Sequence, residues 1–125
     1  MREISLKNVR DLLDSGSLEL VATQVEICFP ILQRIYKKMK LGITFDNIRV
    51  NGSRIVDGHH RYICSILSEI EIGKNVWPIP STAVNFSWDE VIINEDDYEN
   101  AEMILKHNIR DAELNDVDIS VLNDL

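Results

Sequence analysis

The sequence of 125 residues predicts a single α+β domain in which a mixed β-sheet is packed by helices. Residues 48–56 partly alternate between apolar and polar side chains around Asn51-Gly52, a dipeptide typical of tight hairpins. Apolar residues also recur at helical spacing before and after this hairpin. No apolar run approaches the ~20 residues that span a bilayer. A hydrophobic content of 45% and a charged content of 27% are typical of a globular domain.

The N-terminal part predicts two helices. Helical spacing of leucine and valine predicts the first helix over residues 4–16, and Gly16 is expected to end it. A capping box at residues 23–26 predicts the start of the second helix. Pro30 lies inside that helix and predicts a kink or a broken first turn. Gly42 is expected to end it. Its apolar stripe comprises Val25, Cys28, Phe29, Leu32, Ile35, Tyr36 and Met39.

The hairpin is expected to turn at Asn51-Gly52 in a type I′ conformation, since that turn needs positive φ at both central residues. The helix that follows is expected to end near Gly73. Its apolar face comprises Ile63, Ile66, Leu67 and Ile70.

The C-terminal part is less regular. Prolines restrict residues 76–80 to an edge strand, and residues 82–88 predict a further strand or extended segment. Asp96 is expected to cap a helix over residues 97–107. The pattern leaves residues 108–125 open between a last helix and a partly ordered tail. We expect a domain core over about residues 20–90 and an acidic helical extension over about 91–125.

Asp57-Gly58-His59-His60-Arg61 lies at the turn between the hairpin and the next helix. The first turn of a helix presents unpaired N–H groups and a partial positive charge, which suit a phosphate group. Gly58 allows close approach to the backbone, and Arg61 can donate two hydrogen bonds to phosphate oxygens. The simpler interpretation is that Asp57 caps the helix and the other residues form a solvated first turn.

This motif, following strand, turn and strand, resembles the signature of the ParB/sulfiredoxin-like superfamily over about residues 20–80. ParB proteins carry Gly-Glu-Arg-Arg at this turn, sulfiredoxins Gly-Cys-His-Arg, and a free-serine kinase branch a form close to Asp-Gly-His-His-Arg. In those relatives the turn and its helix hold nucleotide phosphates. The resemblance therefore implies that Gly58, His59, His60 and Arg61 bind ATP or another nucleotide. His59 replaces the sulfiredoxin cysteine, and the chain lacks room for the DNA-reading region of ParB.

The resemblance also suggests catalytic roles. Asp57 is a candidate ligand for Mg²⁺ or a proton acceptor, beside its alternative role as a helix cap. The kinase branch uses a glutamate near the start of the helix before the hairpin, which implies Glu26 as the base, or Gln24 if the register shifts. The capping box explains Glu26 without catalysis. His59 and His60 are candidate catalytic residues. Arg54 and Arg49 are possible secondary phosphate contacts or parts of a solvated strand face.

Other chemistry has little support in the sequence. No second cluster with ligand spacing accompanies Asp57 and His59, so a zinc site is weakly indicated. His107 is expected to be a charge partner at a helix end. Cys28 and Cys64 are expected to be buried reduced thiols, which fits the cytoplasm, and the N-terminus lacks a signal peptide's apolar region.

Charge is unevenly distributed along the chain. The net charge is −8, yet residues 89–125 alone hold 2 basic and 12 acidic residues. Residues 34–61 are basic, which favours an anionic ligand next to the motif. The overall acidity argues against avid binding to nucleic acid.

Three functions remain from the sequence. The first is a nucleotide-binding enzyme that transfers a phosphoryl group to a small-molecule acceptor or hydrolyses the nucleotide, with Mg²⁺. The second is a ParB-like nuclease or toxin domain. The third is a non-catalytic module that senses a nucleotide or binds a protein partner through the acidic C-terminal third. We expect the first, and no membrane association. Folding of the acidic segment over the motif would favour the third.

Overall fold

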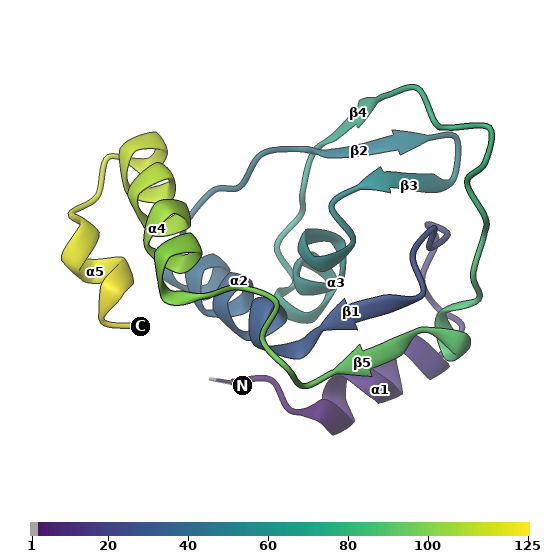
Figure 1. Cartoon of the computed structure of the whole chain (residues 1–125), viewed down its shortest axis with the longest axis horizontal. Coiled ribbons are helices and arrows are strands. Elements are labelled where there is room, and N and C mark those ends of the chain that lie inside the picture. The colour runs from purple at the N-terminus through teal and green to yellow at the C-terminus, as the bar shows by residue number, and fades with distance from the viewer. Residues whose placement is uncertain (1–2) are drawn as a thin grey trace.

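The computed structural model describes residues 3–125 and has an α+β architecture (Figure 1). The predicted hairpin is confirmed, with β2 at Ile48–Asn51 antiparallel to β3 at Arg54–Asp57. The turn itself is Gly52-Ser53, and Gly52 alone has a positive φ, at 60°. The predicted type I′ turn at Asn51-Gly52 is therefore wrong. The two loop residues lie one position later, and glycine at the first loop position is typical of a type II′ turn.

The hairpin belongs to a mixed three-stranded sheet of order β3-β2-β4. Strand β4, at Lys74–Val76, pairs parallel to β2 and forms the edge. The edge position is as predicted, but the strand ends before Pro78 instead of including it. Residues 82–88 contribute only an isolated bridge between Ala22 and Phe86, so the first of the two predicted alternatives, a strand, is not formed there. A 3₁₀ turn, η1 at Trp88–Glu90, follows.

A second sheet pairs β1 at Glu26–Cys28 parallel to β5 at Ile92–Asn94. The helix predicted from the capping box is therefore wrong at its start. The Thr23 hydroxyl donates to the carbonyl of Ile55 at 2.6 Å instead of capping a helix. Because α2 starts at Phe29, Pro30 lies in its first turn. An N–H group at that position would have no partner within the helix, so proline costs no hydrogen bond and needs no kink.

The remaining N-terminal helices follow the predicted pattern only in part. Helix α1 at Leu6–Asp14 is confirmed, with Ser5 and Asn8 forming a capping box. Helix α2 spans Phe29–Leu41 and ends at Gly42, as predicted. Helix α3 spans His59–Ser68, so the end predicted near Gly73 is wrong. Of its predicted apolar face, Ile63 is buried, but Ile66 and Ile70 are exposed.

The C-terminal segment is helical almost throughout. Asn100, not Asp96, caps α4, which spans Ala101–Asn115. Helix α5 follows at Ile119–Asn123, capped by Asp118. The first helix predicted for this region therefore started too early and ended too early, and residues 108–125 are not a loose tail.

Two hydrophobic clusters hold these elements together. The main core lies among α1, α2, α3 and the two sheets. Both cysteines are free and buried, as predicted. A smaller cluster of Ile43, Ala112 and Leu122 fastens α4 and α5 at one end of the molecule (Figure 1). Within residues 3–125, no helix has the length and apolar character needed to cross a membrane.

Candidate functional site

A cavity of about 460 Å³ opens where the start of α3 faces α2 and α4. Its volume lies in the range of small-molecule sites. The cavity brings together the motif residues Asp57, Gly58, His59, His60 and Arg61. It therefore unites the strand-to-helix turn with the C-terminal segment.

Gly58 shapes the turn at the start of α3. Its φ of 103° is a left-handed conformation that glycine adopts without strain. A Cβ atom at this position would lie 2.6 Å from Ile48 Cγ2. Gly58 stands at the N-cap, and no side chain caps α3 in the described chain. The turn thus leaves the first N–H groups of α3 without a side-chain acceptor.

The two histidines tie this turn to the segment before α2. His59 Nε2 accepts from the Thr23 N–H at 2.9 Å, and His60 Nε2 accepts from the Cys28 N–H at 2.9 Å. An Nε2 atom that accepts carries no proton, so each neutral ring carries its proton on Nδ1. The pKa of each histidine is lowered to about 4, mainly by burial, and the neighbouring His60 contributes to the lowering at His59. Both rings are therefore neutral at pH 7, and their Nε2 atoms cannot donate to a phosphate.

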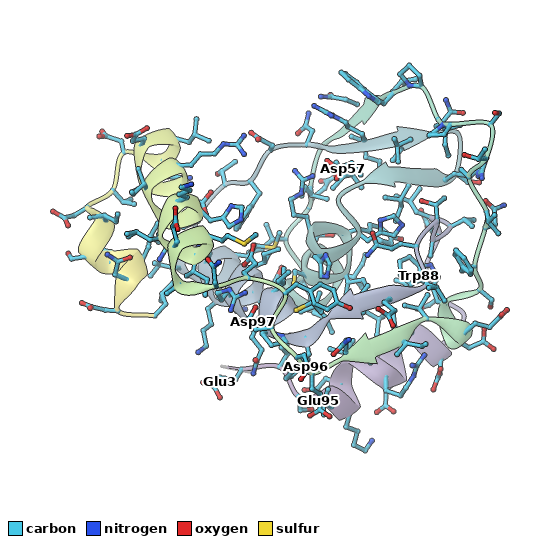
Figure 2. All side chains as sticks on the ribbon, viewed as in Figure 1. Glu3, Asp57, Trp88, Glu95, Asp96 and Asp97 are labelled. Atoms are coloured by element: carbon cyan, nitrogen blue, oxygen red, sulfur yellow. The ribbon has the colours of Figure 1, made fainter. Side chains whose placement is uncertain are left out.

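Arg61 and Asp57 form a second local contact. Arg61 Nη2 donates to Asp57 Oδ2 at 3.2 Å, and Nη1 donates to the carbonyl of Asp46 at 3.0 Å. The Arg61 guanidinium thus fixes the loop before β2 against the start of α3. The Asp57 side chain is 62% exposed at the end of β3 (Figure 2). Asp57 caps no helix here, because Gly58 occupies the N-cap.

Glu26 and Arg54 lie away from this cavity. Glu26 accepts from the Tyr98 hydroxyl at 3.0 Å, whereas Gln24 lines the cavity. Arg54 donates to Asn85 Oδ1 at 2.5 Å and to the carbonyl of Ala83 at 3.0 Å. The structure therefore does not bring these two predicted site residues to the motif. Arg49, the other arginine of the hairpin, does line the cavity.

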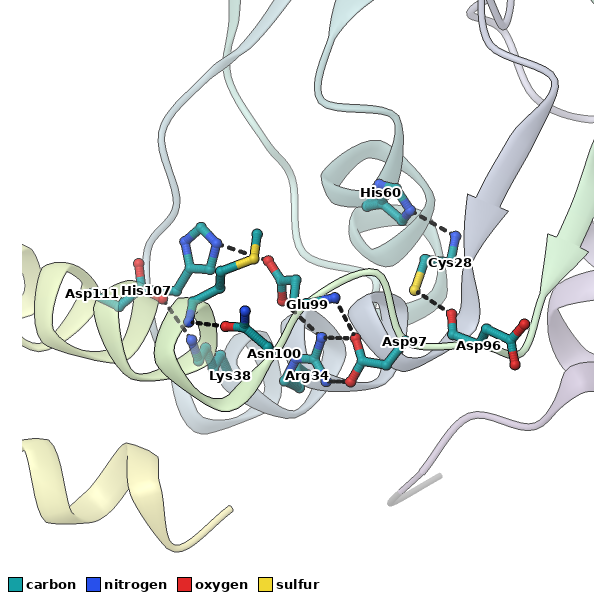
Figure 3. Close-up of polar contacts among 11 residues, drawn as sticks. Cys28, Arg34, Lys38, His60, Asp96, Asp97, Glu99, Asn100, His107 and Asp111 are labelled. Carbon is teal, nitrogen blue, oxygen red and sulfur yellow. Dashed lines mark hydrogen bonds and ion pairs between the residues drawn. The ribbon is translucent and has the colours of Figure 1, made fainter.

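Two cations of the cavity, Arg34 and Lys38 on α2, were predicted only as part of the basic stretch 34–61 and not as individual site residues. Arg34 forms a bidentate pair with Asp97 at 2.7 Å and also donates to Glu99 at 2.7 Å (Figure 3). Hydrogen bonding with Asp97 raises the pKa of Arg34, and Arg34 in turn lowers the pKa of Asp97. Lys38 pairs with Asp111 at 2.7 Å. The four-residue spacing of Arg34 and Lys38, which places both on one helix face, was the available signal.

These ion pairs place the acidic C-terminal segment across the cavity. Glu99, His107, Arg110 and Asp111 all line it. His107 Nε2 lies 2.8 Å from Glu99 Oε2, and Arg110 pairs with Asp46. His107 lies in the middle of α4, so the prediction of a charge partner at a helix end is wrong, and the ring instead contacts Glu99 inside the cavity.

The cavity also constrains metal binding. Among residues 3–125, no group of three or more His, Cys, Asp or Glu side chains is placed to hold a metal ion. A resident metal ion thus finds no closed protein site in this part of the chain.

The chain matches no family model, and comparison with curated proteins and with solved structures finds no similar protein.

Proposed function

We propose that the protein binds the phosphate groups of a nucleotide in the cavity at the start of α3. One observation carries this proposal. Cationic side chains from three elements line the same cavity as the uncapped N-terminus of α3: Arg34 and Lys38 from α2, Arg49 from β2, and Arg61 from α3. Clustered guanidinium groups and helix N–H groups are the usual partners of phosphate.

Arg49 is the cation best placed to receive a phosphate. It has no carboxylate partner in the described chain, and its guanidinium lies 4.0 Å from the centre of the Trp77 ring. Arg34 and Lys38 are already paired with carboxylates. A phosphate would therefore have to share or replace Glu99 and Asp111 at those two cations.

The donor set suits a Mg²⁺ ion that arrives with the nucleotide. Mg²⁺ is usually held by one or two carboxylates together with phosphate oxygens and water. Asp57, exposed at the edge of the cavity, would supply the carboxylate. Bound there, the ion would neutralise phosphate charge, while Gly58 and the α3 N-terminus would orient the phosphates.

Phosphoryl transfer or nucleotide hydrolysis is the reaction that this proposal favours. The resemblance of the motif to the kinase branch of the ParB/sulfiredoxin-like superfamily supports it, together with the cationic side chains that line a cavity of small-molecule size. A nuclease remains the less favoured alternative. Glu99 and Asp111 line the same cavity and would repel a long polyanion.

A second candidate is a non-catalytic nucleotide-sensing module, whose acidic C-terminal segment would also offer a surface to a protein partner. The observation that favours it is the position of the acidic C-terminal segment, which packs over the motif cavity through Glu99, just before α4, and through Asp111 on α4. Such a module would bind nucleotide without turnover, and binding would compete with the ion pairs that hold α4.

We expect Arg49→Ala to weaken nucleotide affinity about tenfold, the equivalent of about 1.4 kcal/mol. The loss follows from removing a guanidinium that no carboxylate in the described chain neutralises. The measurement is a calorimetric and thermal-shift titration with ATP, ADP, CTP and GTP, with and without Mg²⁺. A ligand that binds only the folded protein raises its melting temperature.

Lys74→Ala is the matched control, because it removes an exposed cation from the neighbouring strand β4 outside the cavity. Unchanged affinity in this control, with weakened affinity in Arg49→Ala, supports the proposed site. If none of the four nucleotides binds, the proposed function is contradicted.

A further inference from the structure

Glu99 and His107 form a carboxylate–histidine pair inside the cavity (Figure 3). The Glu99 side chain is only 13% exposed, and its two oxygens have different partners. Oε1 accepts from Arg34 Nη2 at 2.7 Å, and Oε2 lies 2.8 Å from His107 Nε2. Arg34 therefore fixes the carboxylate that in turn orients the imidazole.

This contact defines how the His107 ring can act. With its Nε2 proton directed at Glu99, the neutral ring keeps a lone pair on Nδ1. A proton accepted at Nδ1 makes the ring cationic beside the Glu99 carboxylate, as in a histidine that a carboxylate orients. The ring is 53% exposed, so solvent and small molecules can reach it. These are the features of a general base.

The histidines of the motif are less suited to this role. The Nε2 atoms of His59 and His60 are occupied by main-chain N–H groups, and burial holds both rings neutral well below pH 7. A group with so low a pKa is a weak base. Glu26, the base implied by the family resemblance, lies outside the cavity and accepts from Tyr98.

We propose that His107 is the general base of this site and that Glu99 is its positioning residue. The inference rests on the proposed nucleotide-binding function and assigns the base of its reaction. A water molecule would lose its proton to His107 Nδ1 as its oxygen forms a bond to the terminal phosphorus. The bond from that phosphorus to the bridging oxygen breaks, and the electron pair leaves with the shortened nucleotide.

The competing explanation is that the pair only stabilises the start of α4. In that case His107→Gln would change the melting temperature, but it would not slow turnover while leaving affinity intact. The two explanations therefore differ in the step that is affected. A base contributes to turnover after binding, whereas a structural contact changes stability, or affinity and turnover together.

The first test uses the full chain, Mg²⁺ and the nucleotide that binds best, and measures phosphate release beside the dissociation constant. We expect His107→Gln to lower the turnover rate roughly 100-fold and leave the dissociation constant within about twofold. Lys106→Gln is the matched control, because Lys106 is an exposed neighbour on α4 that does not line the cavity. It is expected to retain full turnover.

Two further readouts separate catalysis from structure. Added imidazole is expected to restore part of the turnover of His107→Gly, because it replaces the missing base without restoring a side-chain contact. Glu99→Gln is expected to slow turnover in the wild-type background but not in His107→Gln, since a positioning residue acts through the group it positions.

The outcomes are distinct. Nucleotide binding without phosphate release would overturn the assignment of His107 and leave the proposed binding function standing. Full turnover in His107→Gln, or a loss that imidazole does not rescue in His107→Gly, would also overturn it. Failure to bind any nucleotide would remove the proposed function and the inference with it.

Discussion

Between pH 7 and pH 4, the free energy of unfolding is expected to fall by roughly 5 kcal/mol because His59 and His60 are buried as neutral rings. Burial, the largest cause for each, lowers their pKa values from 6.5 to about 4. In the unfolded chain both rings take up protons as the pH falls through 6.5. In the folded chain they do not do so until about pH 4.

The direction follows from proton linkage. Within this window the unfolded state binds more protons than the folded state, so acid favours unfolding. The contribution of the two histidines is fully present above pH 6.5 and is lost on approach to pH 4. Asp97, whose pKa Arg34 holds below 3.8, loses its contribution in a more acidic range. The two effects are therefore separable by pH.

The physical cause of the loss is local. A proton on His59 Nε2 would face the N–H of Thr23, and one on His60 Nε2 would face the N–H of Cys28. Each protonation would thus replace a hydrogen bond with two opposed donors in a largely buried place. Since a domain of this size is stable by about 5–15 kcal/mol, partial unfolding near pH 4 is expected.

Urea denaturation at half-unit steps from pH 7 to pH 4 measures this effect. The double variant His59→Gln/His60→Gln should lose most of the pH dependence. The glutamine side-chain oxygen can still accept a hydrogen bond from the main-chain N–H, but the amide does not take up a proton between pH 7 and pH 4. Lys106→Gln is the control, since it changes an exposed side chain that does not line the cavity of the two histidines. A flat stability profile in the wild type would contradict neutral burial of the two histidines.

The hairpin and the turn after it could be predicted because their signals are local. Glycines at 52 and 58 and the strand-to-helix change of period all lie within a few residues of one another. The start of α2 could not be predicted in this way. Residues 23–26 satisfy the pattern of a capping box, but the pairing of β1 with β5 overrides it. That pairing joins residues more than sixty positions apart, so local propensity does not reveal it.

The site shows the same division between local and distant signals. The motif residues lie together in the cavity, as their position at a helix start predicted. Arg34, Lys38 and Glu99 were not predicted as individual site residues because their proximity depends on how α4 packs against α2. The charge asymmetry of the chain was visible, but it did not show that the acidic segment covers the basic one. Glu26 matched the expected place in sequence, yet it lies on β1 and accepts from Tyr98.

Gly58→Ala is expected to lower the free energy of unfolding by roughly 3 to 4 kcal/mol. Two costs add at this position. An alanine would be held at a φ of 103°, which L residues other than glycine rarely adopt. Its Cβ would also lie 2.6 Å from Cγ2 and 2.9 Å from Cβ of the fully buried Ile48, and 2.9 Å from Arg61 Nη2. Because Ile48 is in the core and Arg61 holds the loop before β2, neither neighbour can move freely.

Gly42→Ala separates these two costs, because Gly42 has nearly the same φ, 102°, and open space around its Cα. We expect this control to cost only about 1 to 2 kcal/mol in urea denaturation, the backbone contribution alone. The difference between the two variants then measures the contact with Ile48 and Arg61. Equal losses would mean that a side chain fits at position 58, and the close backbone approach that makes this turn suitable for a phosphate would lose its structural basis.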